Sequence, residues 1–193
     1  HFTLTIRNVG ELTGKLCAMK KGDTVFVRGP FGNGFPAVNK NLILVAGGCG
    51  FLPLRSVYLE NKNRADIKIQ LFIGCKNANS ALFADELKKE RAKHDLNFIF
   101  EQSNEKLSGN VTDLLRETKL LDDALVFICG PEPMYAPVVD ELKIKDVDLK
   151  NVFVSLEKRM HCGVGICQHC ACGVKYVCKD GPVFRWNDVC NTN

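Results

Sequence analysis

Five cysteines crowd into a short segment near the end of the chain, and their spacing could hold a metal centre. Cys162, Cys167 and Cys170 follow the pattern Cys-x4-Cys-x2-Cys, and Cys178 comes after a further seven residues. This is the loop spacing of plant-type [2Fe–2S] sites. Glycines between the cysteines let the backbone approach and direct N–H groups at the sulfurs. We therefore predict that these four thiolates bind a [2Fe–2S] cluster.

Three alternatives stay open at this point, one in the metal and two in the ligands. A structural zinc ion also takes four thiolates, but zinc ribbons pair two Cys-x2-Cys knuckles and this segment has one. Cys172 competes for a ligand position, and we treat it as a neighbour of the site. His161 and His169 could serve as Rieske-type ligands, although that type needs another spacing, so we expect surface or supporting roles for both.

A glycine-rich turn earlier in the chain is typical of a nucleotide site. It follows the continuous apolar run of residues 42–46 and opens a helix, so a phosphate could meet backbone N–H groups there. The alternative is that these glycines serve only tight packing, because the spacing is not Gly-x-Gly-x-x-Gly. The predicted nucleotide-binding residues of this turn are Gly47, Gly48, Gly50 and Pro53.

A second loop follows the fourth strand of the pattern and reads Cys-Gly-Pro-Glu-Pro-Met over residues 129–134. Ligands of open α/β sheets bind at the carboxyl ends of strands, so both loops can face one crevice that takes NAD(P)H. We predict Cys129 as the catalytic residue, beside the reacting ring, against the alternative of a buried small apolar residue. Lys76 follows the second strand and could favour a 2′-phosphate or simply be solvated. The other predicted contacts are Gly130, Pro131 and Met134.

The middle of the chain alternates between strands and helices. We expect strands over residues 42–46, 67–73, 97–100, 124–129 and 152–155, and helices over 53–63, 80–93, 111–117 and 133–144. Asn79 and Ser80 offer an N-cap, and His94 is expected at the surface near a helix C-terminus. The alternation predicts a doubly wound parallel sheet with helices on both faces.

The two ends of the chain differ from this middle part. Residues 2–7 alternate in polarity and 24–27 are apolar, so the first 40 residues are expected to be all-β. The last ~40 residues are too poor in large aliphatic side chains to build a core without a bound metal. We therefore divide the chain into 1–40, 41–155 and 156–193.

Composition excludes several classes of protein. The chain has 193 residues, ten cysteines and a net charge of +4, which is too small to indicate nucleic-acid binding. No apolar run reaches the ~18 residues of a membrane span, and the first residues do not form a signal peptide. A tight cysteine cluster without such a signal indicates a reducing compartment, so we expect a cytoplasmic protein.

Taken together, these motifs resemble ferredoxin–NADP reductase-like iron–sulfur electron-transfer subunits. The family includes the sulfhydrogenase gamma subunit, the corresponding subunit of anaerobic sulfite reductase, the small subunit of NADH-dependent ferredoxin–NADP oxidoreductase and the dihydroorotate dehydrogenase electron-transfer subunit. Besides the cysteine and glycine motifs, the shared sequences are those of residues 29–36, 156–163 and 177–184. The resemblance covers nearly the whole chain.

The resemblance implies a flavin-binding β-barrel, of which residues 1–40 would be the last part. Residues 10–16 correspond to a Gly-x-x-Thr/Ser-x-x-Leu segment that would hold the FAD pyrophosphate. The implied contacts are Gly10, Thr13, Gly14 and Lys15, although Thr13 could also be a turn residue. The family's Arg-x-Tyr/Phe-Ser flavin motif has no match here, and the chain begins inside an expected strand. We therefore expect the upstream part of the barrel to lie outside this sequence.

The implied function is electron transfer. NAD(P)H would give a hydride to FAD, and single electrons would pass through the [2Fe–2S] cluster to or from a partner redox subunit in a hetero-oligomer. One alternative makes that partner a dihydroorotate dehydrogenase. A second alternative, of another class, is a zinc-stapled nucleotide-binding interaction module.

Overall fold

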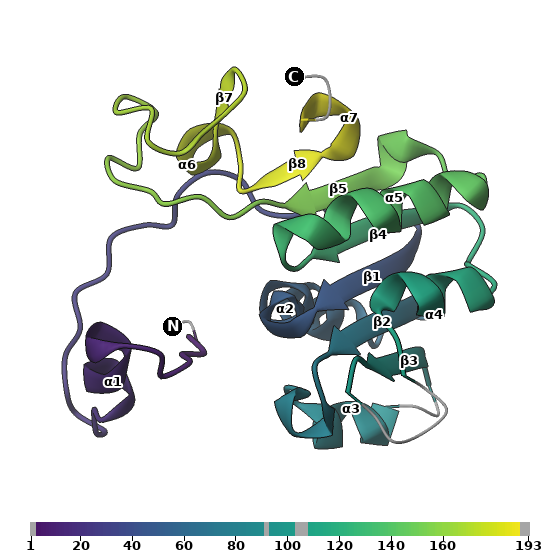
Figure 1. Cartoon of the computed structure of the whole chain (residues 1–193), viewed down its shortest axis with the longest axis horizontal. Coiled ribbons are helices and arrows are strands. Elements are labelled where there is room, and N and C mark those ends of the chain that lie inside the picture. The colour runs from purple at the N-terminus through teal and green to yellow at the C-terminus, as the bar shows by residue number, and fades with distance from the viewer. Residues whose placement is uncertain (1–2, 91–92, 103–107, 190–193) are drawn as a thin grey trace. The chain divides into compact units, whose positions relative to one another are not determined.

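The computed structural model describes residues 3–90, 93–102 and 108–189. The contacts among residues divide the chain into two compact units, His1–Pro30 and Phe31–Asn193. Figure 1 shows the helices and strands of both units. The predicted division into 1–40, 41–155 and 156–193 stays a prediction, because the last two of these regions lie in one unit.

Six strands form one sheet in the second unit, in the order β3-β2-β1-β4-β5-β8. They are β1 Asn41–Gly47, β2 Ile69–Cys75, β3 Asp95–Phe100, β4 Ala124–Cys129, β5 Val152–Ser155 and β8 Val183–Arg185. The first five are parallel, and β8 is antiparallel to β5. The strand order reverses between β1 and β4, which pair with each other. The carboxyl ends of β1 and β4 therefore flank the position where open α/β sheets bind ligands.

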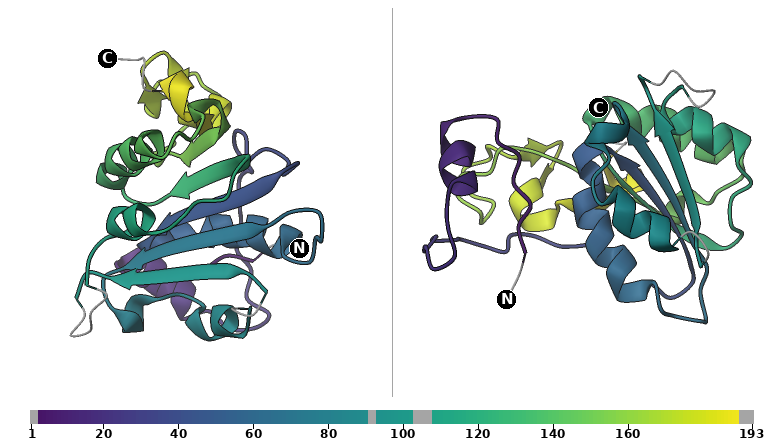
Figure 2. Two further views of the ribbon diagram at one scale, coloured as in Figure 1. Left: turned by 90° about the vertical axis from the view of Figure 1, so that its right-hand side faces the viewer. Right: turned by 90° about the horizontal axis from the view of Figure 1, so that it is seen from below.

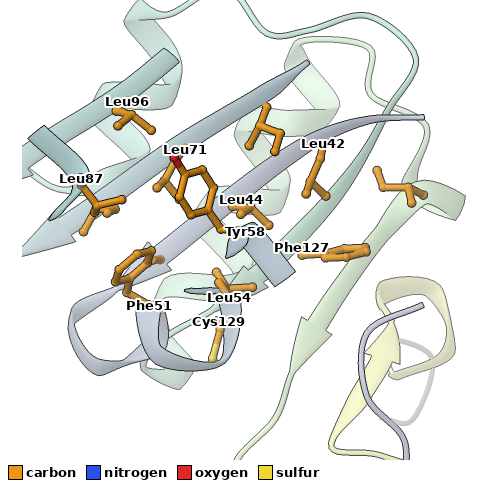
Figure 3. Close-up of a cluster of buried hydrophobic side chains, with 14 of the residues drawn as sticks. Leu42, Leu44, Phe51, Leu54, Tyr58, Leu71, Leu87, Leu96, Phe127 and Cys129 are labelled. Carbon is orange, nitrogen blue, oxygen red and sulfur yellow. The ribbon is translucent and has the colours of Figure 1, made fainter. Parts of the chain in front are cut away.

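Helices cover both faces of this sheet (Figures 1 and 2). Along β1, Leu42 and Leu44 point into one buried cluster and Ile43 and Val45 into another, because side chains alternate across a strand. The first cluster packs against α2 Phe51–Asn61 and α3 Ala84–Glu90 (Figure 3). The second packs against α4 Val111–Glu117 and α5 Tyr135–Ile144.

Local sequence explains where these helices begin. The Asn110 side chain accepts hydrogen bonds from the backbone N–H groups of Thr112 at 2.9 Å and Asp113 at 3.3 Å, which caps α4. Pro53 and Pro137 lie in the first turns of α2 and α5, where a missing N–H removes no helical hydrogen bond. These starts place the amino ends of α2 and α5 directly after the two loops that follow β1 and β4.

The doubly wound prediction is confirmed, with two local corrections. The N-cap expected at Asn79 and Ser80 is wrong, because Asn77 caps the short helix η2 Ala78–Ser80 and α3 begins at Ala84. The surface position expected for His94 is also wrong. Its ring is half-buried and packs edge-on against Tyr58, with centroids 5.5 Å apart.

The segment after β5 contains short elements only. They are β6 Ala171–Cys172, β7 Lys175–Tyr176, α6 Val177–Asp180, β8 and α7 Trp186–Val189. Three further 3-10 helices of the unit lie before β5: η1 Gly48–Gly50, η3 Glu132–Met134 and η4 Leu149–Asn151. Strand β8 joins the main sheet, with Phe184 opposite Val154. This pairing was not predicted, because three residues give no clear periodicity.

The strands expected at residues 2–7 and 24–27 are wrong for the described residues of the first unit, 3–30. The only regular element there is the helix α1 Glu11–Cys17. Val9, Leu12 and Phe26 are exposed, and Phe26 fully so. A strand needs a hydrogen-bonded neighbour, and the described part of this unit pairs no two segments as strands. Among the described residues, no helix is long and apolar enough to span a membrane.

Candidate functional site

The two predicted nucleotide loops lie in contact at the reversal of the sheet. A Cβ added to Gly50 would lie 2.0 Å from the carbonyl oxygen of Cys129, and one added to Gly47 would lie 2.6 Å from the sulfur of Met134. The contact at Gly50 is with backbone, which cannot move aside as the Met134 side chain can, so glycine is required at Gly50 for the approach of the two loops. The structure therefore brings together the residues predicted from two separate motifs.

The turn after β1 also has an open side. Gly48 has φ +53°, which favours glycine, and a Cβ placed there would meet no atom within 4 Å. This side of the turn precedes the amino end of α2, where backbone N–H groups and the helix dipole favour a phosphate. The geometry suits the predicted nucleotide contacts of Gly48 and Gly50.

Cys129 ends β4 inside the first buried cluster, which it shares with Leu54 (Figure 3). Its side chain is 2% exposed. Burial raises the pKa of its thiol to about 11, although a hydrogen bond from the Ser155 side chain acts in the opposite direction. Cys129 is therefore a neutral thiol at physiological pH, which suits a packing role beside a substrate better than nucleophilic attack.

The end of β2 adds two further residues to this edge of the sheet. Cys75 is buried, and desolvation followed by the charge of Cys49 raises the pKa of its thiol. Lys76 is exposed at the end of β2. Its predicted interaction with a 2′-phosphate stays a prediction.

The four predicted cluster ligands gather in the segment after β5 as two pairs. The backbone N–H of Cys167 donates to the sulfur of Cys162 at 3.5 Å, and the backbone N–H of Cys178 donates to the sulfur of Cys170 at 3.4 Å. Among the described residues, no group of three or more His, Cys, Asp or Glu side chains could hold a single metal ion. Two pairs of thiols fit a cluster in which two irons each take two protein ligands.

Backbone N–H groups surround the sulfur of Cys162. Val164 and Ile166 donate to it at 3.4 Å and Cys167 at 3.5 Å. These hydrogen bonds, the one from Cys167 first, lower the pKa of the Cys162 thiol to about 6. A thiolate is the form that binds metal, and N–H groups aimed at sulfur stabilise the negative charge of a bound cluster. The backbone of this loop therefore stabilises the thiolate form of Cys162.

The second pair, Cys170 and Cys178, is buried. The N–H of Cys178 donates to the sulfur of Cys170 at 3.4 Å, and both side chains are 1% exposed. Burial raises the pKa of the Cys178 thiol, and the hydrogen bond with Cys170 raises it further, whereas the backbone N–H of Gly165 lowers it. The contact with Gly165 joins α6 to the cysteine loop.

The remaining residues of this segment lie around the thiols. Cys172 is in β6 and packs, partly buried, against the small core formed by Cys170, Val177, Cys178 and Phe184. The rings of His161 and His169 stack with centroids 3.9 Å apart. These positions agree with neighbouring rather than ligating roles, although the ligand set itself stays a prediction.

The predicted flavin-phosphate residues belong to α1. The Thr13 hydroxyl accepts from the N–H groups of Val9 and Gly10, both at 3.0 Å, and Lys15 forms an ion pair with Glu11 at 2.6 Å. These side chains serve local contacts of the helix. The flavin contacts of Gly10, Thr13, Gly14 and Lys15 stay a prediction that depends on the resemblance.

A cavity of about 750 Å³ lies at the opposite edge of the sheet, near the amino ends of β1 and β4. It is lined by four lysines and four aspartates among other residues. Lys40 forms an ion pair with Asp123 at 2.9 Å, and Lys145 donates to carbonyl groups at the end of α4. Several of the charged side chains that line the cavity are therefore already paired. The cavity lies at the amino ends of the strands, whereas the nucleotide loops follow their carboxyl ends.

Sequence reasoning did not single out a residue that contacts the second nucleotide loop. Tyr135 is buried at the start of α5, and its hydroxyl contacts Gly130 and the backbone of Ser155. The signal was present as a tyrosine directly after the Cys-Gly-Pro-x-x-Met motif.

Comparisons with known proteins agree with these two sites. The oxidoreductase NAD-binding domain family matches residues 44–140, and the iron–sulfur cluster binding domain of dihydroorotate dehydrogenase B matches residues 157–190. The match to an iron–sulfur domain favours the [2Fe–2S] prediction over zinc.

Two curated relatives come from Pyrococcus furiosus. Sulfhydrogenase 2 subunit gamma is 38% identical, over 98% of this chain and 75% of the relative. A probable dihydroorotate dehydrogenase B (NAD(+)) electron transfer subunit is 32% identical, over 98% of this chain and 72% of the relative. The solved structure of an NADH-dependent reduced ferredoxin–NADP oxidoreductase is 28% identical with a TM-score of 0.70, over 97% of this chain and 70% of that one. The chain therefore belongs to the family of ferredoxin reductase-like iron–sulfur electron-transfer subunits that contains those of sulfhydrogenase and dihydroorotate dehydrogenase B.

Proposed function

We propose that this chain is the subunit that carries electrons between NAD(P)H and a partner redox subunit, through a flavin and a [2Fe–2S] cluster. The observation that carries the proposal is that one compact unit contains both the two touching loops that follow β1 and β4 and the cysteine segment after β5. When bound, a flavin accepts a hydride and releases its electrons singly, and a [2Fe–2S] cluster carries one electron at a time.

On the nucleotide side, the backbone does most of the binding. Gly48 and Gly50 present bare backbone at the amino end of α2, where a pyrophosphate would lie. The loop of residues 130–134 packs against this turn and would hold the nicotinamide in one orientation. Cys129 stays protonated and buried directly before this loop, so it would pack beside the nicotinamide without reacting.

On the cluster side, Cys162, Cys167, Cys170 and Cys178 would hold the two irons. Three N–H groups already point at the sulfur of Cys162, so little reorganisation is needed when the site is loaded. The burial of Cys170 and Cys178 keeps water from one side of the site.

The partner is inferred from the relatives. Because the similar subunits belong to a sulfhydrogenase and a dihydroorotate dehydrogenase B, we propose a hetero-oligomer with a hydrogenase-type or related redox subunit. A dihydroorotate dehydrogenase partner is the second candidate, and the match of residues 157–190 to that enzyme's iron–sulfur domain favours it. Because a tight cluster of metal-binding cysteines is typical of reducing compartments, we propose a cytoplasmic location.

Anaerobic purification of the native complex tests the proposal. We expect iron and sulfide in the preparation, visible absorbance of a [2Fe–2S] cluster and of a flavin, and bleaching of both when NADH or NADPH is added. Mass spectrometry of the co-purifying subunit distinguishes the two partners. A colourless preparation that contains zinc, or absorbance that neither nucleotide changes, would contradict the proposal.

A further inference from the structure

The hydroxyl of Tyr135 joins two parts of the second unit. It accepts a hydrogen bond from the backbone N–H of Gly130 at 3.4 Å and donates one to the carbonyl oxygen of Ser155. Gly130 belongs to the nucleotide loop, and Ser155 is the last residue of β5. The sheet already pairs Cys129, the residue before Gly130, with Ser155, and the tyrosine adds a second, side-chain connection between the loop and the end of β5.

The peptide group between Ser155 and Leu156 continues this connection. Its carbonyl accepts from Tyr135, and its N–H donates to the carbonyl oxygen of Pro182 at 2.9 Å. Pro182 lies between α6, which carries Cys178, and β8. One peptide group is therefore linked through Tyr135 to the nucleotide loop on one side and bonded directly to the segment of the cluster ligands on the other.

These hydrogen bonds lie in the interior. Tyr135 is 5% exposed and Ser155 is 9% exposed. In a low-dielectric interior, consecutive hydrogen bonds polarise one another, and a partner left without its bond finds no water to replace it. Loss of the hydroxyl would leave both the N–H of Gly130 and the carbonyl of Ser155 without this partner.

We propose that Tyr135 is a positioning residue whose hydroxyl couples the nucleotide loop to the cysteine segment, so that NAD(P) bound at the loop stabilises the backbone at Leu156. This inference rests on the proposed function, because it needs a nucleotide at Gly130. By linkage, a variant without the hydroxyl binds nucleotide more weakly and loses the effect of nucleotide on Leu156.

The chain offers a matched control. Tyr58 is fully buried in the same unit, but its hydroxyl has no hydrogen-bond partner among the described residues. Tyr58→Phe therefore removes the same atom as Tyr135→Phe without breaking a hydrogen bond. Neither residue is among the predicted nucleotide contacts or thiol ligands.

The test uses the full cluster-loaded chain in its complex and whichever of NAD⁺ and NADP⁺ binds the wild type more tightly. In Tyr135→Phe we expect the nucleotide dissociation constant to rise about tenfold, as for one lost hydrogen bond to a buried group. In the wild type and in Tyr58→Phe, nucleotide should slow amide hydrogen exchange in peptides covering residues 129–135 and 153–160. In Tyr135→Phe the protection of 153–160 should be lost.

Three results would overturn the inference. An unchanged dissociation constant in Tyr135→Phe, or an equal rise in Tyr58→Phe, shows that the hydroxyl does not position the loop. Wild-type exchange at 153–160 that nucleotide leaves unchanged excludes the coupling, even if Tyr135→Phe does not fold. Each of these leaves the proposed function intact, whereas a wild type that binds neither nucleotide overturns the proposed function as well.

Discussion

The cysteine thiols of the two sites differ in how readily they lose their proton. Burial in an apolar cluster raises the pKa of the Cys129 thiol to about 11. Three backbone N–H groups lower that of Cys162 to about 6. Cys129 is consequently a neutral packing group and Cys162 a ready metal ligand. Burial and the number of backbone N–H donors, rather than the residue type, decide which chemistry each cysteine can perform.

The state of Cys129 has a measurable consequence for stability. In the unfolded chain this thiol loses its proton near its ordinary pKa of 9.0, but in the folded chain it keeps the proton up to about 11. Between these values the folded state binds more protons, so the free energy of unfolding falls as pH rises, by up to about 1.4 kcal/mol per pH unit. Denaturant titrations at pH 8 and pH 10.5 should show a larger loss for the wild type than for Cys129→Ser. Equal losses would show that Cys129 is ionised in the folded protein.

At the scale of elements, the nucleotide site is made by two loops that touch. Gly50→Ala would place a methyl group 2.0 Å from the carbonyl oxygen of Cys129, so the loops must move apart. Because a displacement of about 1 Å can cost two orders of magnitude in rate, we expect NAD(P)H oxidation to fall at least tenfold. Steady-state assays measure this, with cluster absorbance unchanged. Gly34→Ala is the control, since a Cβ there meets no atom within 4 Å. Wild-type activity in Gly50→Ala would contradict the loop contact.

The sequence predicts most of the sheet because its central strands are buried on both faces. The apolar run at residues 42–46 lies inside β1, and residues 124–129 are β4 itself. Alternation alone was not sufficient at residues 2–7, where a strand also needs a partner to pair with. The short strand β8 was missed for the converse reason: three residues carry little periodicity, and the edge of β5 supplies the hydrogen bonds.

The sequence also predicts most residues of the candidate site, but not how they contact one another. Spacing identified Cys162 and its three companions, and strand ends identified the two glycine loops. The pairing of the thiols and the role of Tyr135 depend on contacts between residues distant in sequence, such as Tyr135 with Ser155. Such contacts follow from the packing of whole elements and leave no local pattern.

The cysteine segment gives a sharp test of the ligand assignment. Cys178→Ser removes a buried thiol of the second pair, so we expect loss of most of the cluster absorbance and of the bound iron. Cys172→Ser changes a thiol in the same segment that lies in β6, and iron content should stay at the wild-type value. Iron and sulfide analysis of both anaerobically purified variants measures this. Iron loss in Cys172→Ser with retention in Cys178→Ser would reverse the assignment.

Across the second unit, the buried side chains are distributed unevenly. The two clusters that flank the sheet contain most of them, including six residues of β4. The cluster of the cysteine segment has only four buried members: Cys170, Val177, Cys178 and Phe184. Two of the four are proposed ligands, so the packing of this segment depends on the metal, whereas that of the α/β part does not.

Removal of the metal should therefore unfold one part of the molecule and leave the other intact. After anaerobic treatment with a chelator, we expect new tryptic cuts at Lys158, Arg159 and Lys175, because cleavage needs local unfolding as well as exposure. Residues 41–155 should stay protected, because their core contains none of the proposed ligands. Reconstitution with iron and sulfide should restore resistance, whereas zinc or buffer alone should not. Equal digestion with and without the metal would mean that the short elements after β5 are held by the pairing of β8 with β5 and the packing of Phe184, and that the metal contributes electron transfer without contributing to the fold.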